Sequence, residues 1–407
     1  MNLVKRELYL AQLRRLCDKN LIKVVTGIRR CGKSTILQMF RDELLAKGVT
    51  ANRIAFVNFE EFENAKYLHD CAAAYYDIIG RLDLTKPCYV FLDEVQNVKE
   101  FERLVDGLFV KPNVDLYVTG SNAYLLSGEL ATLLTGRYIE IHAQPFSFAE
   151  YVSLFPSVSK SELLNQYIAN GGMPGTVGLS ELDAVPYLKN IYQSIIKKDV
   201  LTRHRWHADN QFERVTQFIF DSIGLFLSPT KIAATLQASG VVTSKHSIAN
   251  YLDALTESFL FYKVRRFDVR GKKILSTQEK YYAADLGFKR AITGEAMFAD
   301  MGRNLENMVF LELLRRGNEV FIGKADNSEI DFVARPLGGS PEYIQVAYTA
   351  KEEATRKREM HPFTVAKDYN RRTLITTDHE PTANINGIRK IYVADWLLEN
   401  QVTKSAP

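Results

Sequence analysis

Short apolar runs alternate with helix-like stretches through the first 145 residues of the chain. This alternation is typical of parallel strands joined by helices that cover a sheet. The sequence therefore predicts an α/β fold, with a three-layer parallel sheet, for residues 1–150. The predicted strands cover residues 21–25, 54–59, 89–92, 115–118 and 138–141.

Helical patterns continue over residues 151–205, on both sides of a Gly171-Gly172-Met173-Pro174 turn, and end in a basic stretch. We interpret this part as a helical lid and a connector. Further on, Ser228 and Pro229 begin one helix, a second helix starts near residue 243, and an alternating strand leads to a hairpin tip that contains glycine. Helix, turn, helix and hairpin in this order predict a winged helix for residues 206–290.

Residues 291–407 show a different order, in which a helix is followed by three strands, a charged helix and further strands at 373–376 and 391–394. This order resembles the restriction-endonuclease-like fold. In active members of that fold, a glutamate, an aspartate and a Glu/Gln-x-Lys motif gather a metal and a water. The counterparts here are Glu306, Asp331 and Gln345, but Ala347 stands in place of the lysine. The resemblance therefore implies a degenerate nuclease site in a domain that binds a partner or reads DNA shape.

The composition is that of a globular protein with two to four domains, since 46% of the 407 residues are hydrophobic and 25% are charged. No apolar stretch approaches the roughly 18 residues that a membrane-spanning helix needs. The N-terminus has the pattern of an amphipathic helix and not of a signal peptide. We therefore expect a cytoplasmic protein without a membrane partner. The net charge of +4 is too small to indicate nucleic acid by itself.

Residues 27–34 form a complete G-x-x-x-x-G-K-[ST] phosphate-binding loop between a predicted strand and a predicted helix. Gly27 and Gly32 allow the backbone to curl so that its N–H groups point at phosphates. Lys33 supplies a cation, and Ser34 supplies a hydroxyl for Mg²⁺. We therefore expect ATP and Mg²⁺ as ligands. The other candidates for nucleotide binding are Arg29, Arg30, Cys31 and Thr35.

The third predicted strand ends in Asp93 and Glu94, two carboxylates at the point where a buried strand emerges. This is a Walker B pattern. Asp93 is expected to hold Mg²⁺ through its water shell, and Glu94 to orient and polarise the attacking water. Beside a phosphate-binding loop, an acidic pair of this kind predicts hydrolysis as well as binding.

Two further segments are candidates for sensing and stabilising the γ-phosphate. Thr119 and Asn122 follow the fourth strand, where they could act as sensors or simply cap the next helix. Arg137 precedes the fifth strand and could serve as an arginine finger in a neighbouring subunit. The alternative is a cation that interacts with the C-terminal end of a helix.

These motifs resemble the AAA+ branch of the P-loop ATPases, specifically prokaryotic ATPases with a C-terminal domain of unknown function. The resemblance covers residues 1 to about 200 and also includes Gln144-Pro145-Phe146-Ser147-Phe148 and the 171–174 turn. It implies that the fourth strand lies between the phosphate-loop strand and the Walker B strand. It also implies a homo-oligomer, as a ring or a partial ring.

The leading hypothesis is an AAA+ ATPase whose cycle moves its C-terminal modules, with DNA and an unidentified protein as possible partners. The alternatives are a slow nucleotide-gated switch, separable by its basal turnover, and an ATP-regulated nuclease. Solvent-facing positions of the predicted winged helix could contact phosphates, although basic wing tips are often simply solvated. These positions are Lys245, His246, Arg265, Arg266, Arg270, Lys272 and Lys273.

Overall fold

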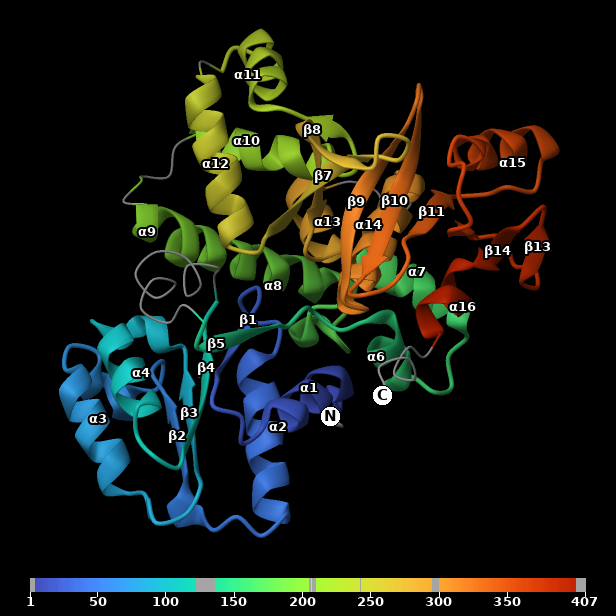
Figure 1. Cartoon of the computed structure of the whole chain (residues 1–407). Coiled ribbons are helices and arrows are strands. Elements are labelled where there is room, and N and C mark those ends of the chain that lie inside the picture. The colour runs from blue at the N-terminus through green and yellow to red at the C-terminus, as the bar shows by residue number, and fades with distance from the viewer. Residues whose placement is uncertain are drawn as a thin grey trace. The chain divides into compact units, whose positions relative to one another are not determined.

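The computed structural model describes residues 4–121, 136–204, 206, 210–241, 243–294 and 300–399. The chain divides into two compact units (Figure 1). One consists of Met1–Pro145 with Glu257–Phe259, and the other of Phe146–Thr256 with Leu260–Pro407. Among the described residues, no helix has the length and apolar character needed to cross a membrane.

The first unit is built on a five-stranded sheet with the order β2-β3-β4-β1-β5, in which every neighbouring pair is parallel. The predicted α/β fold is confirmed, and β4 lies between β1 and β3 as the family resemblance implies. The strands are β1 (Ile22–Thr26), β2 (Ile54–Asn58), β3 (Cys88–Asp93), β4 (Val114–Thr119) and β5 (Tyr138–His142).

Helices cover both faces of this sheet because successive strand residues point to opposite sides. On one face, Val90 and Leu92 of β3 pack in a cluster with α3 (Cys71–Gly80) and α4 (Phe101–Phe109). On the other face, Phe91 lies 6.4 Å from Phe40 of α2 (Lys33–Ala46), between ring centroids. Figure 1 shows these two helical layers, with α1 (Glu7–Leu16) beside α2. The remaining short elements of this unit are η1 (Ala51–Arg53), η2 (Phe62–Tyr67) and η3 (Val95–Asn97).

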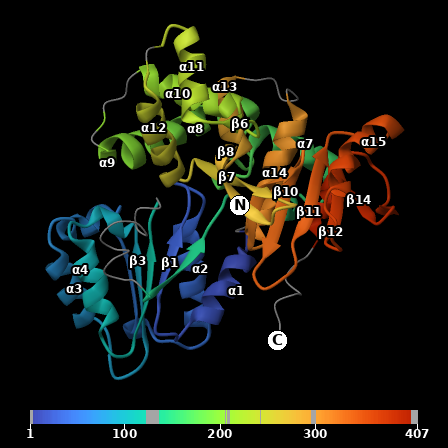
Figure 2. The ribbon, with the colours of Figure 1, turned by 45° about the horizontal axis from the view of Figure 1, so that its top comes forward.

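The second unit is built on a mixed nine-stranded sheet with the order β13-β14-β12-β11-β10-β9-β7-β8-β6. Helix α14 (Met301–Arg315) packs along β9, β10 and β11 (Figure 2). The strands are β6 (Phe226–Leu227), β7 (Phe261–Asp268), β8 (Lys273–Ala283), β9 (Asn318–Ala325), β10 (Ser328–Pro336), β11 (Glu342–Ala347), β12 (Arg371–Thr376), β13 (Ala383–Ile385) and β14 (Ile388–Tyr392).

Two helices, over residues 229–238 and 245–257, lie between β6 and the β7–β8 hairpin, in the order that the sequence predicts. The predicted strand at 391–394 differs, because β14 ends at Tyr392 and a helix begins at Val393. The helices are α6 (Phe148–Ser153), α7 (Lys160–Asn170), η5 (Pro174–Thr176), α8 (Glu181–Ser194), the π-helix η6 (Ile195–Leu201), α9 (Thr202–His204), α10 (Asn210–Asp221), α11 (Pro229–Ala238), α12 (Lys245–Glu257), α13 (Leu286–Thr293), α15 (Glu353–Met360), η7 (His361–Thr364) and α16 (Val393–Leu398).

The hairpin of the predicted winged helix is part of the same sheet as the predicted nuclease-like strands. Strand β7 pairs in parallel with β9, with Arg266 opposite Ile322 and Asp268 opposite Lys324. Strands from the two predicted domains, 206–290 and 291–407, therefore belong to one sheet, and the boundary at residue 290 stays a prediction. The boundaries proposed at residues 150 and 205 stay predictions.

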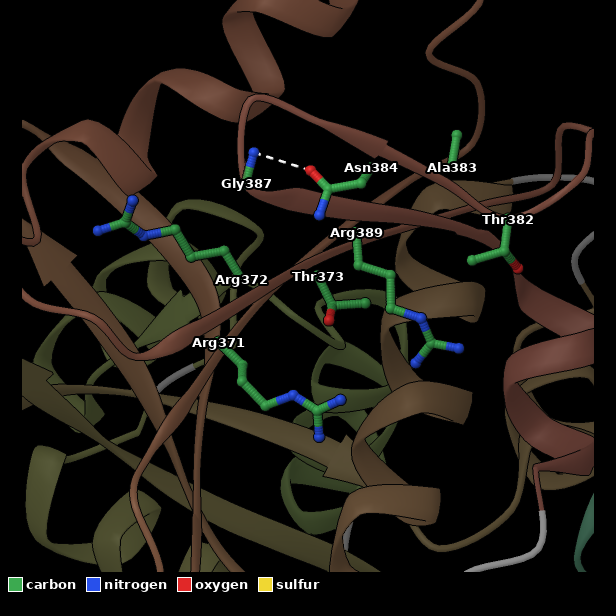
Figure 3. Close-up of a pocket in the computed structure, with 8 residues that line it drawn as sticks. All are labelled: Arg371, Arg372, Thr373, Thr382, Ala383, Asn384, Gly387 and Arg389. Atoms are coloured by element: carbon green, nitrogen blue, oxygen red, sulfur yellow. Dashed lines mark hydrogen bonds between the residues drawn. The ribbon is translucent and has the colours of Figure 1, made fainter.

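A pocket of about 420 Å³ lies at the β12–β14 edge of this sheet (Figure 3). Its basic side chains are largely engaged in the fold. Arg389 forms an ion pair with Glu399, and Arg372 points away from the pocket and donates to the carbonyl oxygens of Ala366 and Asp368. The pocket lining consists of Arg371, Arg372, Thr373, Thr382, Ala383, Asn384, Gly387 and Arg389.

Candidate nucleotide site

The phosphate-binding loop requires glycine at its two glycine positions. Gly27 has a φ of +139°, and a Cβ atom there would lie 2.0 Å from the carbonyl oxygen of Ala143. Gly32 has a φ of +103° at the N-terminus of α2. Because side chains are excluded at both positions, the loop can curl tightly between β1 and α2 and expose its N–H groups.

The side chain of Lys33 folds back over the loop, and only 3% of the residue's surface is exposed. Its ammonium donates to the carbonyl oxygens of Gly27, at 3.0 Å, and Ile28, at 3.4 Å. The same nitrogen lies 3.7 Å from Oε1 of Glu94. The structure thus brings together the predicted cation and the predicted catalytic carboxylate on either side of the loop.

Asp93 is buried and its carboxylate is positioned by Thr119. The Thr119 hydroxyl donates to Oδ1 of Asp93 at 2.6 Å and accepts the backbone N–H of Glu94 at 2.8 Å. Burial raises the pKa of Asp93, while hydrogen bonds from Thr119 and Ser34 oppose that rise. Within the described residues, Oδ2 of Asp93 is buried without a hydrogen-bond partner.

This donor set fits Mg²⁺. An unpartnered buried carboxylate oxygen beside the Ser34 hydroxyl supplies the hard oxygen ligands that Mg²⁺ prefers. Thr119, a candidate for a γ-phosphate sensor or a helix cap, contacts Asp93 and Glu94 and thereby positions the two acids. Asn122, the other sensor candidate, lies outside the described residues.

Glu94 is held by a residue that the sequence analysis did not identify. It adopts a left-handed backbone conformation, with a φ of 52°, and its Oε2 accepts a hydrogen bond from Nε2 of Gln96. Gln96 also lies 3.5 Å from the Ser121 hydroxyl. The only sequence signal was the proximity of Gln96 to Glu94 along the chain, which says nothing of orientation.

Arg29 joins the same network from the phosphate-binding loop. It forms an ion pair with Glu60 at 3.0 Å and lies 3.5 Å from the Ser121 hydroxyl. Arg30 is exposed and Thr35 is half-buried. Of the predicted loop side chains, Arg29 therefore connects the loop to the segments that follow β2 and β4.

Arg6 hydrogen-bonds to the backbone of the phosphate-binding loop, a role that the sequence analysis missed. Its buried guanidinium donates to the carbonyl oxygens of Cys31, at 3.0 Å, and Gln144, at 2.6 Å. The Cys31 thiol is also buried and donates to the carbonyl oxygen of Ala143 at 3.4 Å. Burial raises the pKa of this thiol, so Cys31 serves packing and holds its proton at neutral pH.

Arg137 lies at the opposite edge of the sheet from the loop. It precedes β5, and its carbonyl oxygen accepts the N–H of Ile22, at the start of β1. Because a strand rises about 3.3 Å per residue, the five residues of β1 separate this edge from the loop by roughly 16 Å. The Arg137 guanidinium is 48% exposed and forms an ion pair with Asp106 at 2.9 Å.

Most of the predicted phosphate-contacting residues of the second unit are exposed on α12 and on the β7–β8 hairpin. Arg266 differs from this expectation. Its guanidinium lies 4.7 Å from the ring centroid of Phe226 and donates to Gln278 at 2.7 Å. The exposed residues are Lys245, His246, Arg265, Arg270, Lys272 and Lys273.

The three residues of the predicted degenerate nuclease site are buried close together in the second unit. The N–H of Asp331 on β10 donates to the side-chain oxygen of Gln345 on β11 at 3.3 Å. Burial and the nearby charge of Glu306 on α14 raise the pKa of Asp331 well above its usual range. A lysine also enters this cluster, Lys280 from β8, whose ammonium lies 2.9 Å from Glu306.

The Gly171-Gly172-Met173-Pro174 turn, predicted as part of a lid, binds a buried carboxylate within the second unit. Asp285 accepts the N–H groups of Gly172, at 2.6 Å, and Gly287, at 2.8 Å. A Cβ atom on Gly171 would lie 1.8 Å from Oδ1 of Asp285. The glycines are therefore required because the carboxylate lies against the backbone.

Comparisons with known proteins match both parts of the chain. A family profile described as "AAA domain" matches residues 19–152. A second profile, for a domain of unknown function (DUF8612), matches residues 161–297. The latter range includes most of the predicted lid and the predicted winged helix.

Two relatives and one solved structure extend this picture. An uncharacterised protein of Haemophilus influenzae is 39% identical over 402 residues, which cover 98% of this chain and 99% of that protein. An uncharacterised protein of Methanocaldococcus jannaschii is 28% identical over 365 residues, with 84% and 78% covered. A Walker-type ATPase of Pyrococcus abyssi superposes with a TM-score of 0.50 and 15% identity, over 71% of this chain and 96% of that one. At that identity the similarity concerns the fold alone.

Proposed function

Since the chain belongs to the AAA+ family of P-loop ATPases, we propose that it binds and hydrolyses ATP with Mg²⁺. The single observation that carries this proposal is the arrangement around β3. Asp93 keeps one oxygen without a partner among the described residues, and Glu94 faces Lys33 across the loop.

Each residue of this site has a distinct task in the proposed reaction. The loop amides and Lys33 bind the phosphates, and Ser34 and Asp93 would hold Mg²⁺, which neutralises charge on the phosphate oxygens. Glu94 orients the attacking water and accepts its proton. Thr119 positions both acids, because its hydroxyl contacts the Asp93 carboxylate and the Glu94 backbone.

Replacing Lys33 with alanine tests nucleotide binding. The variant loses the cation over the loop, so we expect the affinity for Mg²⁺-ATP to fall at least about 30-fold, since charge-assisted contacts to phosphate are the strong ones. Isothermal titration calorimetry measures this affinity. Lys47→Ala, at the other end of α2, is the control and keeps wild-type affinity. If folded wild-type protein binds neither ATP nor GTP in the presence of magnesium, the proposed function is wrong.

The position of Glu94 favours a slow basal cycle, the second candidate function. One of its oxygens accepts from Gln96 and the other faces Lys33, so both are engaged by neighbouring side chains. A cycle of this kind suits a nucleotide-gated switch with long-lived bound states. Steady-state phosphate release, with and without duplex DNA, single-stranded DNA or RNA, separates this switch from a motor.

We further propose that Arg137 acts on the nucleotide of a neighbouring subunit, because within its own chain it lies at the far edge of the sheet. Arg137→Ala should lower kcat at least about 100-fold, as is typical for loss of an arginine finger. Arg103→Ala, which removes an exposed arginine of the same unit, is the control.

Mixing Arg137→Ala with Glu94→Gln subunits tests action between subunits. In mixed assemblies, an intact Arg137 from one variant meets an intact Glu94 from the other, so some ATPase activity should return. Phosphate release measures the recovery, and size-exclusion chromatography verifies that the variants assemble together. Mixed assemblies without any recovery would exclude this role for Arg137.

A further inference from the structure

Glu306, Asp331 and Gln345 of the second unit form what we call the nuclease-like cluster, and this cluster also contains a lysine. The resemblance to nucleases places that lysine at residue 347, but here it comes from β8. Lys280 of β8 is 4% exposed. Its ammonium lies 2.9 Å from Oε1 of Glu306 on α14 and 2.5 Å from Oε1 of Glu329 on β10. A single nitrogen therefore bridges two carboxylates from different elements.

Further hydrogen bonds and one aromatic ring surround the Lys280 nitrogen and its carboxylates. The Tyr282 hydroxyl donates to the same oxygen of Glu306. Oδ2 of Asp331 accepts the N–H of Val346 at 2.7 Å. The centroid of the Phe226 ring lies 5.4 Å from the Lys280 nitrogen. The lysine is thus enclosed by acceptors and an aromatic face.

The geometry of the cluster suits an ammonium and not Mg²⁺. Mg²⁺ binds its oxygen ligands at about 2.0–2.1 Å, and Ca²⁺ at about 2.3–2.6 Å. The carboxylate oxygens of this cluster stand 2.5 and 2.9 Å from the lysine nitrogen. In the part of the chain that the structure describes, no three ligand atoms from Glu306, Glu329 and Asp331 come within 4.8 Å of one another. With the Lys280 ammonium between them, these carboxylates therefore do not fit the metal that a nuclease of this fold would use.

We infer that the Lys280 ammonium takes the place of a divalent metal in this cluster. The ammonium offsets part of the charge of Glu306 and Glu329 from within the chain, and the second unit recruits no Mg²⁺ or Mn²⁺ there. The same bridge joins β8 of the hairpin to α14 and β10. What would be a catalytic centre in a nuclease is here an internal ion-pair junction between the hairpin and the α/β part of the unit.

The inference predicts that removing the lysine creates a metal site. Lys280→Met keeps an unbranched side chain, one atom shorter than lysine, but leaves the buried carboxylates without the ammonium, so the melting temperature should fall by roughly 5 °C or more. Mn²⁺ or Ca²⁺ at millimolar concentration should restore about half of that loss. The measurement is thermal unfolding of the full chain without nucleotide, in chelator and in each metal.

Two control variants separate a metal site from general stabilisation. Lys289 is another buried lysine, and its ammonium donates to the amide oxygen of Asn304, also on α14, at 3.0 Å. Lys289→Met should lower the melting temperature without any recovery in metal. Adding Glu306→Gln to Lys280→Met should abolish the recovery, because one ligand carboxylate is lost.

Three outcomes overturn the inference. It is wrong if Mn²⁺ raises the melting temperature of the wild-type chain and Glu306→Gln removes that rise. It is also wrong if Lys280→Met folds and does not respond to metal, or if Lys289→Met recovers equally. Should Lys280→Met not fold, titration of the wild-type chain and of Glu306→Gln with Mn²⁺ decides alone.

Discussion

Replacing Glu94 with glutamine should leave ATP binding intact and lower hydrolysis at least about 100-fold, the usual effect of losing a general base. Glutamine keeps the size of the side chain and can still hydrogen-bond to Gln96, but it cannot accept the proton of the attacking water. Steady-state phosphate release measures the turnover. Calorimetric titration with Mg²⁺-ATP measures the affinity.

The control for this prediction is Glu100→Gln. Glu100 shares the left-handed backbone conformation of Glu94, with a φ of 57°, but its carboxylate pairs with Arg103 at the surface. We expect wild-type turnover in this variant. Wild-type turnover in Glu94→Gln would show that another group activates the water and would remove Glu94 from the mechanism.

The part of the nucleotide site that depends on adjacent residues could be predicted from the sequence. Gly27, Lys33 and Ser34 lie within one turn, and Asp93 and Glu94 end one buried strand. Their positions in the sequence determine their orientation, because the backbone of the loop and the direction of the strand determine where they point. The strand order of the first unit was predicted differently, from the family resemblance.

The contacts that support this site could not be predicted, because the partners lie far apart in the sequence. Arg6 donates to the carbonyl oxygen of Gln144, 138 residues later. Thr119 is 26 residues from its partner Asp93, and a small polar residue after a strand has no preferred partner. Hydrogen bonds to backbone carbonyls leave no pattern of residue types.

The lysine of the nuclease-like cluster could not be predicted either, because it lies far from Gln345 in the sequence. The comparison with the fold placed a lysine two positions after Gln345 and found alanine. The structure supplies a lysine from β8, a strand that the sequence analysis assigned to another domain. Only the pairing of β7 with β9 reveals that these strands share one sheet.

The second large effect expected is a pH-dependent stability that originates at Asp285. Burial raises the pKa of this carboxyl to about 7, although the N–H groups of Gly172, Gly287 and Met173 oppose the rise. Because the folded state binds the proton more tightly than the unfolded state, the stabilisation is fully present below pH 4. It is lost as the pH rises through 7. A pKa shift of this size corresponds to about 4 kcal/mol at most.

Asp285→Asn isolates this contribution, because asparagine keeps an acceptor for the turn but does not titrate. We expect the free energy of unfolding of the wild type, relative to Asp285→Asn, to decrease by about 2–4 kcal/mol between pH 4 and pH 7.5. Denaturant titration followed by tryptophan fluorescence reports on the correct unit, since the chain has two tryptophans and Trp206 and Trp396 both belong to the second unit. A difference that stays constant over this range would mean that Asp285 is ionised in the folded state at pH 4, and that the 171–174 turn binds a permanent carboxylate.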